Sequence, residues 1–419
     1  MDSPSAELSR PAWTIGAREF VVLMGLLQAL QALAIDAMLP ALAQISHDLG
    51  AAGANQRQLV VGLYLIFAGA GSLVPGTLAD RFGRRPVVLG CVAGYVVFTA
   101  MAALVTSFDA LLVSRAALGF ASAGLAVLPP AIIRDRFSGD RMARLQSTIA
   151  MVFMIVPMIA PTLGQAVLLV AGWRWIFGMM ALLGLAVLGW AWARLPESLD
   201  PGHRGMVHPA MVVRTMATIV VTRGAAGYVF GMALIQAAMW GYINSAQQLV
   251  AEHFGAGSRF PTIFGVMALA MATTNFVNAR IVERFGARRV SHAALITYCL
   301  VSALQLATAL SGRETLWSFV PLMTANMCMM SFIGANFASI AMQPFARTAG
   351  AAASAQAFIR IALAAILGAA VGQAYDGSAR PLAIALLGAG TLAMALVLFS
   401  ERGRLFRRLL PPGTPRPIA

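Results

Sequence analysis

Long apolar stretches alternate with short polar loops along almost the whole of this 419-residue chain. Each stretch holds about 20 residues or more, which is the length that an α-helix needs to cross a bilayer. None of them shows the alternation of apolar and polar residues that is typical of membrane β-strands. The pattern therefore predicts twelve transmembrane helices in an all-α integral membrane protein. Their expected limits are 19–44, 57–79, 86–106, 109–133, 142–170, 174–194, 217–250, 260–282, 290–311, 315–341, 350–374 and 380–400.

The longest polar connection, between Pro196 and Pro209, follows the sixth stretch and divides the chain into two sets of six helices. We expect an N-terminal bundle over residues 1–195, a linker over 196–213 and a C-terminal bundle over 214–419. A repeated signature supports this division, because Asp-Arg-Phe-Gly follows the second stretch at 80–83 and Glu-Arg-Phe-Gly follows the eighth at 283–286. Parallel repeats of this kind occur in transporters that move two bundles around a binding site near the middle of the membrane.

Composition and charge exclude several classes of function. Hydrophobic residues make up 59% of the chain and charged residues 11%, whereas soluble domains have about 25% charged residues. All 30 basic residues are arginines, and all but Arg115 and Arg360 lie in or near short loops. The net charge of +14 therefore reflects membrane topology and not a nucleic-acid surface. The three cysteines lie singly in apolar stretches, which predicts no metal site. A phosphate-binding loop with lysine is missing, so we expect neither an ATP-driven pump nor an enzyme, and no cofactor.

The distribution of arginine predicts how the chain is oriented. Most arginines lie in the two termini and in the loops after even-numbered helices. The loops on the opposite side hold Arg57, Arg174, Arg259, Arg313 and Arg380. Because arginine accumulates in cytoplasmic loops, we expect both termini in the cytoplasm.

Four segments resemble motifs of the major facilitator superfamily. Residues 76–85, Gly-Thr-Leu-Ala-Asp-Arg-Phe-Gly-Arg-Arg, are similar to the loop signature between its second and third helices. Residues 115–119 resemble its fourth-helix arginine motif, and residues 156–164 resemble the proline–glycine motif of its proton-driven exporters. Residues 34–42 are similar to the first-helix motif of the Bcr/CflA drug-export subfamily.

The resemblance implies a fold of two six-helix bundles and the export of small amphipathic compounds, such as antibiotics, in exchange for protons. It also implies a bacterial inner-membrane protein that acts as a monomer, with a small-molecule substrate, protons and the lipid bilayer as its partners. A proton-linked or facilitative permease for a small metabolite is the alternative function.

Asp36 is the one acidic residue that lies well inside a predicted span. A carboxylate held in a membrane is costly and points to a proton or ion carrier. Counted along the helices, Asp36 lies about 25 Å from the inner end of its span and Arg115 about 9 Å from the outer end of another, so their depths overlap. Desolvation favours the neutral acid and a nearby guanidinium favours the carboxylate. We therefore expect a proton-coupling pair, with a static buried pair as the alternative.

The loop signature predicts a conformational latch. A carboxylate at the end of one helix can accept hydrogen bonds from the start of the next, and glycine permits the tight turn between them. The arginines can pair with carboxylates on neighbouring helices, or they can serve topology alone. The latch residues are Gly76, Asp80, Arg81, Gly83, Arg84 and Arg85.

Two further groups complete the predicted site. Pro157, Pro161 and Gly164 are expected to kink the fifth span and act as a hinge, although such residues are also common in ordinary membrane helices. Polar and aromatic side chains in the seventh and eleventh spans are the substrate-binding candidates, and Arg360 has structural pairing as its alternative role. These candidates are Trp240, Tyr242, Asn244, Gln247 and Arg360.

Overall fold

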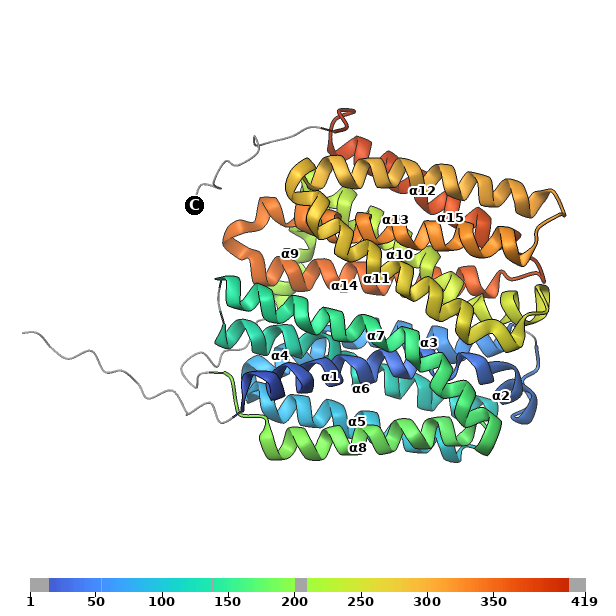
Figure 1. The fold of residues 1–419 in the computed structure, drawn as a ribbon. Helices are drawn as coiled ribbons and strands as arrows, with labels where there is room; N and C mark the ends of the chain where they lie inside the picture. Colours follow the sequence, from blue (N-terminus) through green and yellow to red (C-terminus); the bar gives the residue numbers. More distant parts are fainter. Residues whose placement is uncertain (1–14, 54, 138, 200–208, 407–419) are drawn as a thin grey trace, which may run out of the picture.

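The computed structural model describes residues 15–53, 55–137, 139–199 and 209–406, and every regular element within these ranges is a helix (Figure 1). Ten helical segments are long and apolar enough to cross a membrane, and a bent pair forms an eleventh. The remaining predicted span falls on α7, which is apolar over Ile155–Ala171. The all-α fold is therefore confirmed, and the described helices are consistent with the twelve expected spans.

The first half of the chain runs from α1 to α8 and is coloured blue to green in Figure 1. Its helices are α1 (Ala17–Asp36), α2 (Leu42–Asp48), α3 (Leu59–Gly71), α4 (Leu73–Phe82), α5 (Arg84–Leu104), α6 (Phe108–Arg136), α7 (Gly139–Ala171) and α8 (Arg174–Arg194), with short 3-10 turns at Leu39–Ala41 and Gln56–Gln58.

The second half runs from α9 to α15 and is coloured yellow-green to red. Its helices are α9 (Pro209–Val221), α10 (Arg223–Gln247), α11 (Phe260–Phe285), α12 (Ala287–Leu310), α13 (Leu316–Met342), α14 (Ala349–Gln373) and α15 (Arg380–Ser400), and π-helical Gln248–His253 extends α10. Residues 200–208 of the expected linker and both chain ends lie outside the described residues.

Proline breaks the first and second spans. The ring of Pro40 would clash with the carbonyl of Asp36 in a continuous helix, and α1 ends at Asp36. Pro75 has the same relation to Gly71, where α3 ends and α4 turns away by 40°. The first span expected over 19–44 is confirmed as Ala17–Asp48, with the α-helix interrupted by a 3-10 turn after Asp36.

The seventh span begins later than the sequence predicts. A helix was expected over 217–250, but α9 ends at Val221 and α10 starts at Arg223. Thr222 between them has an extended backbone (ψ 95°), which interrupts the helical hydrogen bonds.

Small residues bring the two halves together where α3 meets α14 and α7 meets α11. A Cβ added at Gly62 would lie 3.3 Å from Ala369, and one added at Gly69 would lie 3.3 Å from Ala362. On the other side, a Cβ at Gly265 would lie 3.4 Å from the carbonyl oxygen of Met158. The halves thus contact each other along two pairs of helices, as the neighbouring ribbons in Figure 1 show.

Candidate functional site

A cluster that we call the polar core lies inside the first half and consists of Asp36, Tyr64, Arg115 and Ser122. All four are buried, with exposed fractions of 5%, 0%, 0% and 0%. The Tyr64 hydroxyl lies 3.0 Å from Ser122 Oγ. The Tyr64 hydroxyl also donates to the carbonyl of Gln31 in α1 at 3.4 Å. The polar core therefore joins α1, α3 and α6.

Arg115 is the hub of the polar core. Its Nε donates to the Val60 carbonyl and its Nη2 donates to the Ala34 carbonyl, both at 2.9 Å. Ala34 lies in the last turn of α1, where unpaired carbonyls and the helix dipole favour a cation. The guanidinium also lies over the Tyr64 ring, 4.5 Å from its centre. Arg115 thus fastens the broken end of α1 to α3.

The expected ion pair between Asp36 and Arg115 is absent from this conformation of the described chain. No nitrogen of Arg115 lies within 4.0 Å of a carboxylate, and Nη1 is buried without a hydrogen-bond partner. The backbone carbonyls of Ala34 in α1 and of Val60 in α3 take the place of the carboxylate. The sequence predicted the neighbourhood of Asp36 and Arg115 but not this arrangement.

Two glycines allow the helices around the polar core to approach closely. A Cβ at Gly164 of α7 would lie 1.8 Å from the carbonyl oxygen of Ala37, the residue after Asp36. A Cβ at Gly119 of α6 would lie 2.2 Å from the carbonyl oxygen of Tyr64. Real Cβ atoms essentially never come within 3.0 Å of such neighbours. Only glycine fits at either position with the helices placed as they are.

The predicted hinge residues lie in α7, which stays helical through both Pro157 and Pro161. The helix is therefore not broken there, in contrast to the first span. Its position is nevertheless central, because α7 packs on α1 at Gly164 and on α11 of the other half at Met158.

The predicted latch residues form an arginine cluster at the end of the molecule where even-numbered spans finish, which we call the arginine-rich end. Arg84 pairs with Asp80 and with Asp135 at the end of α6, both at 2.8 Å. The backbone N–H groups of Arg84 and Arg85 donate to the Glu197 carboxylate at 2.9 and 3.1 Å. Glu197 thus occupies the N-terminus of α5, where the helix dipole favours a carboxylate.

The remaining latch residues contribute in different ways. Gly83 has φ +102°, and a Cβ there would lie 2.4 Å from Glu197, so the turn requires glycine. Arg81 lies over the Phe82 ring at 5.1 Å. A Cβ at Gly76 would meet Val127 at an ordinary 4.0 Å. The described ion pairs of this cluster join elements of the first half to one another.

The second half has a carboxylate in the corresponding place, but it pairs with an arginine side chain and not with backbone N–H groups. Arg288 pairs with Glu401 just after α15, at 2.8 Å. Burial by itself raises the pKa of Glu401, but hydrogen bonds from Arg288 and Tyr228 outweigh it and hold that pKa below its usual value. Arg288 lies 204 residues after Arg84, and Glu401 lies 204 residues after Glu197. The internal repeat therefore includes a carboxylate after the last helix of each half, which the sequence interpretation missed.

The substrate candidates of α10 divide between two environments. Asn244 lies between the halves, because a Cβ at Gly62 would lie 3.5 Å from its Oδ1 and one at Gly372 would lie 2.8 Å from its Cβ. Trp240 lies against α14 at Gly368. Tyr242 is fully buried in the second half, beside Met267 and Phe319.

Gln247 and Asn244 both keep an unused acceptor. The Oε1 of Gln247 and the Oδ1 of Asn244 are buried without a hydrogen-bond partner. A buried amide oxygen left unpaired is costly, so these two atoms are able to accept a hydrogen bond from a ligand.

Arg360 lies apart from these amides, in the second half. It donates to the Oε1 of Gln236 on α10 and lines a cavity of about 140 Å³ between α10, α13 and α14. The sequence gave no signal for its partner, because Gln236 is one of several amides in apolar stretches.

The geometry agrees with the comparisons to known proteins. The model of the Major Facilitator Superfamily matches residues 24–369. The chain belongs to this superfamily. It is therefore a multi-pass membrane transporter, and the expectation that it is not an enzyme follows from its family.

Relatives of the transporter include an uncharacterized transporter and a homolog of an antibiotic-resistance protein. An uncharacterized MFS-type transporter YdgK of Bacillus subtilis is 30% identical over 288 residues, covering 68% of this chain and 71% of that protein. A bicyclomycin resistance protein homolog of Haemophilus influenzae is 26% identical over 295 residues, covering 70% and 73%. The crystal structure of the D-xylose–proton symporter superposes with a TM-score of 0.68 at 15% identity, covering 93% of this chain and 97% of that one. This last similarity shows the fold alone.

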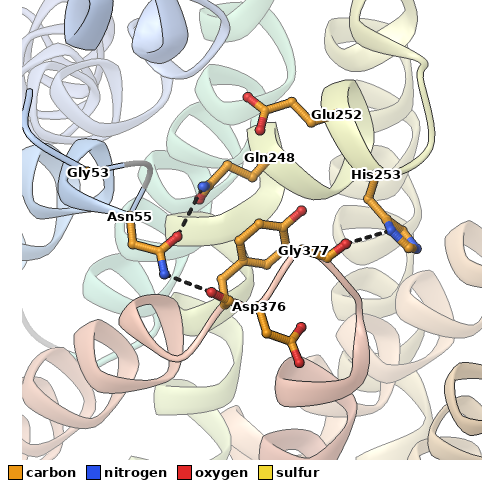
Figure 2. Close-up of a pocket in the computed structure, with 8 residues that line it drawn as sticks. Gly53, Asn55, Gln248, Glu252, His253, Asp376 and Gly377 are labelled. Atoms are coloured by element: carbon orange, nitrogen blue, oxygen red, sulfur yellow. Dashed lines mark hydrogen bonds between the residues drawn. The ribbon is translucent and has the colours of Figure 1, made fainter.

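The transporter is closed at the end opposite the arginine cluster, which we call the arginine-poor end. Arg57 of the first half pairs with Glu252 of the second half at 2.5 Å. Asn55 donates to the carbonyls of Tyr375 and Gln373. Its Oδ1 accepts a hydrogen bond from Gln248, as Figure 2 shows. Asn55, Gln248, Glu252 and Tyr375 line an open groove of about 620 Å³, and Asp376 also lines it. Sequence reasoning missed this network because its members lie in polar loops that meet only in the fold.

Removing the negative charge of Glu252 is expected to open the arginine-poor end. Glu252→Gln leaves Arg57, which is 6% exposed, without its counter-charge. The Glu252 side chain is 46% exposed, so solvent screens the pair and its loss costs about 1 kcal/mol. We expect the ratio of closed to open molecules to fall by about fivefold. Spin labels at Gly53 and Ala374, in a background without the three native cysteines, measure this as a longer distance population.

The matched control is Asp376→Asn in the same groove. Asp376 accepts a hydrogen bond from Ser378 of its own half, so this change removes a charge without removing a contact between the halves. The double change Arg57→Gln with Glu252→Gln should shift the distances less than Glu252→Gln alone, since it leaves no unpaired charge. Unchanged distances in the single variant would show that the ion pair does not hold this end closed.

Proposed function

We propose that the transporter exports small amphipathic compounds, such as antibiotics, in exchange for protons. The observation that carries this proposal is the burial of Asp36 at the broken end of α1, next to an arginine that no carboxylate neutralises. A charged carboxylate at this depth of a membrane is costly, and acidic residues in such positions commonly carry protons. The resistance named for the Haemophilus influenzae relative supports an antibiotic as the substrate.

The arrangement of arginines supports an orientation. We infer that the arginine-rich end faces the cytoplasm of a bacterial cell and that the protein lies in the inner membrane. Both termini are then cytoplasmic, although residues 1–14 and 407–419 lie outside the described residues. Since the polar contacts at the arginine-poor end join the halves, the described conformation is closed on the side away from the cytoplasm.

The proposed cycle assigns a task to each part. When Asp36 carries a proton it is neutral, and Arg115 remains on the carbonyls of Val60 and Ala34. Loss of that proton gives Asp36 a negative charge. Arg115 Nη1, which has no partner in the described conformation, can then bind Asp36 after a small shift of the broken helix. This shift moves α7 through Gly164, and α7 passes the movement to α11 in the other half. The arginine clusters keep each half rigid while the halves move.

All of these parts come from one chain, so the cycle requires a single copy of the protein. The unpaired oxygens of Asn244 and Gln247 and the ring of Trp240 are the proposed contacts for the substrate between the halves.

The test is antibiotic accumulation in an efflux-deficient bacterial host. Cells with the transporter should hold less chloramphenicol or bicyclomycin than cells without it, and a protonophore should remove the difference. Inside-out vesicles should release protons from their acidified interior when the compound is added. An increase in accumulation with the transporter, or a difference that survives collapse of the gradient, would favour the permease.

A further inference from the structure

The guanidinium of Arg360 has an unbalanced charge inside the second half. Among the described residues no carboxylate lies within 4.0 Å of it. Its acceptor, Gln236 Oε1, is a neutral amide. Arg360 lies about 16 Å along α14 from Ala349, near the middle of the span. An arginine at this depth is costly unless it serves a partner or a ligand.

The side chain faces the interior of the second half. Ala362 and Ala369 pack on α3 of the first half, and at about 100° per residue Arg360 points away from that face of α14. It lines the cavity together with Gln356, Met232 and Phe337.

The cavity offers one cation and an adaptable apolar wall. Gln356 donates its Nε2 to the Ala341 carbonyl, and the Tyr228 hydroxyl is engaged with His292 and Glu401, so these groups are committed to the protein. The thioether of Met232 can adapt to apolar ligands of different shape. Ala338 and Ala353 on its lining are exposed, so the cavity is open and not sealed.

The size of the cavity limits what it holds. Drug-sized pockets measure about 300–1,000 Å³, whereas this cavity measures about 140 Å³. It therefore accommodates one charged group with a small apolar body. A planar carboxylate matches the fork of the guanidinium, which can donate two parallel hydrogen bonds to it.

We propose that Arg360 is a binding site for the acidic group of amphipathic organic anions, such as aromatic carboxylates. The inference that Arg360 binds a transported substrate rests on the proposed function. It extends that function to anionic compounds.

The experiment compares two ligands that differ in charge and share one apolar body, 2-naphthoate and 2-naphthamide. Their binding to the purified full-length protein is measured by calorimetry at one pH, without a proton gradient. The wild type should bind the carboxylate about tenfold more tightly than the amide. Arg360→Gln should lose this preference, and Arg360→Lys should keep part of it, because a point charge replaces the fork.

The controls separate charge from folding. Arg280→Gln removes an exposed arginine of the same half and should retain the preference. If Arg360→Gln does not fold, Gln236→Glu replaces it, since a carboxylate beside Arg360 should abolish the preference equally. Equal binding of both ligands to the wild type, binding of neither, or a preference that survives in Arg360→Gln and Gln236→Glu overturns the proposal.

The two proposals fail separately. Proton-driven export of a neutral antibiotic without any preference for naphthoate would exclude the anion site and leave the exporter intact. A preference for naphthoate that depends on Arg360, in a protein that exports nothing, would exclude the exporter and leave the site intact.

Discussion

Asp36→Asn is expected to abolish proton-driven export and to reduce it to the level of vesicles without the protein. Asparagine has nearly the same shape as aspartic acid but cannot release a proton, so the cycle loses its titratable group. Binding of a neutral substrate should persist, because the amide resembles the protonated acid. The measurement is substrate-driven proton release from inside-out vesicles that contain equal amounts of each protein.

The control for this variant is Asp109→Asn. Asp109 is exposed at the first turn of α6 and lies outside the polar core. It should transport at the wild-type rate. Gradient-driven export that is unchanged in Asp36→Asn would refute the coupling role of Asp36.

Gly164→Ala is expected to cause the second largest loss. The added methyl group would lie 1.8 Å from the Ala37 carbonyl oxygen, so α7 and the broken end of α1 must separate by more than 1 Å. Overpacking of this kind costs about 1–3 kcal/mol. We expect a lower thermal midpoint of unfolding and a loss of export, because Ala37 directly follows Asp36.

Gly189→Ala in α8 is the matched control. A Cβ at Gly189 meets no atom within 4 Å, and alanine favours a helix over glycine by about 1 kcal/mol. Its stability should equal or exceed that of the wild type. A Gly164→Ala protein with normal stability and normal export would show that α7 can leave α1 without consequence.

The sequence predicted the helices well, because a membrane-spanning helix can be recognised from the length and the apolar composition of its segment alone. A run of about 20 apolar residues has few alternatives to a helix in a membrane. The breaks were less evident, although Pro40 and Pro75 carried the signal. In these two spans the helix ends four residues before the proline, whereas α7 stays helical through Pro157 and Pro161, so a proline alone does not predict a helix end.

The candidate site was predicted in part. Asp36 and Arg115 came from the rarity of charge inside apolar stretches, and both lie in the polar core. The surroundings of Tyr242 could not be predicted, because the face that a residue occupies depends on the neighbouring helices. Glu197 could have been found by extending the repeat, since the same 204-residue offset relates Arg84 to Arg288.

By itself the sequence determined that this protein crosses a membrane many times, that its halves repeat, and that one acid is held away from water. These follow from local composition, because the cost of exposing polar groups to lipid acts on each segment separately. Only the tertiary structure decided that Arg115 binds carbonyls in place of Asp36, and that Arg57 meets Glu252 across the halves. Such contacts join residues far apart in the chain, and their partners are fixed by how the helices pack.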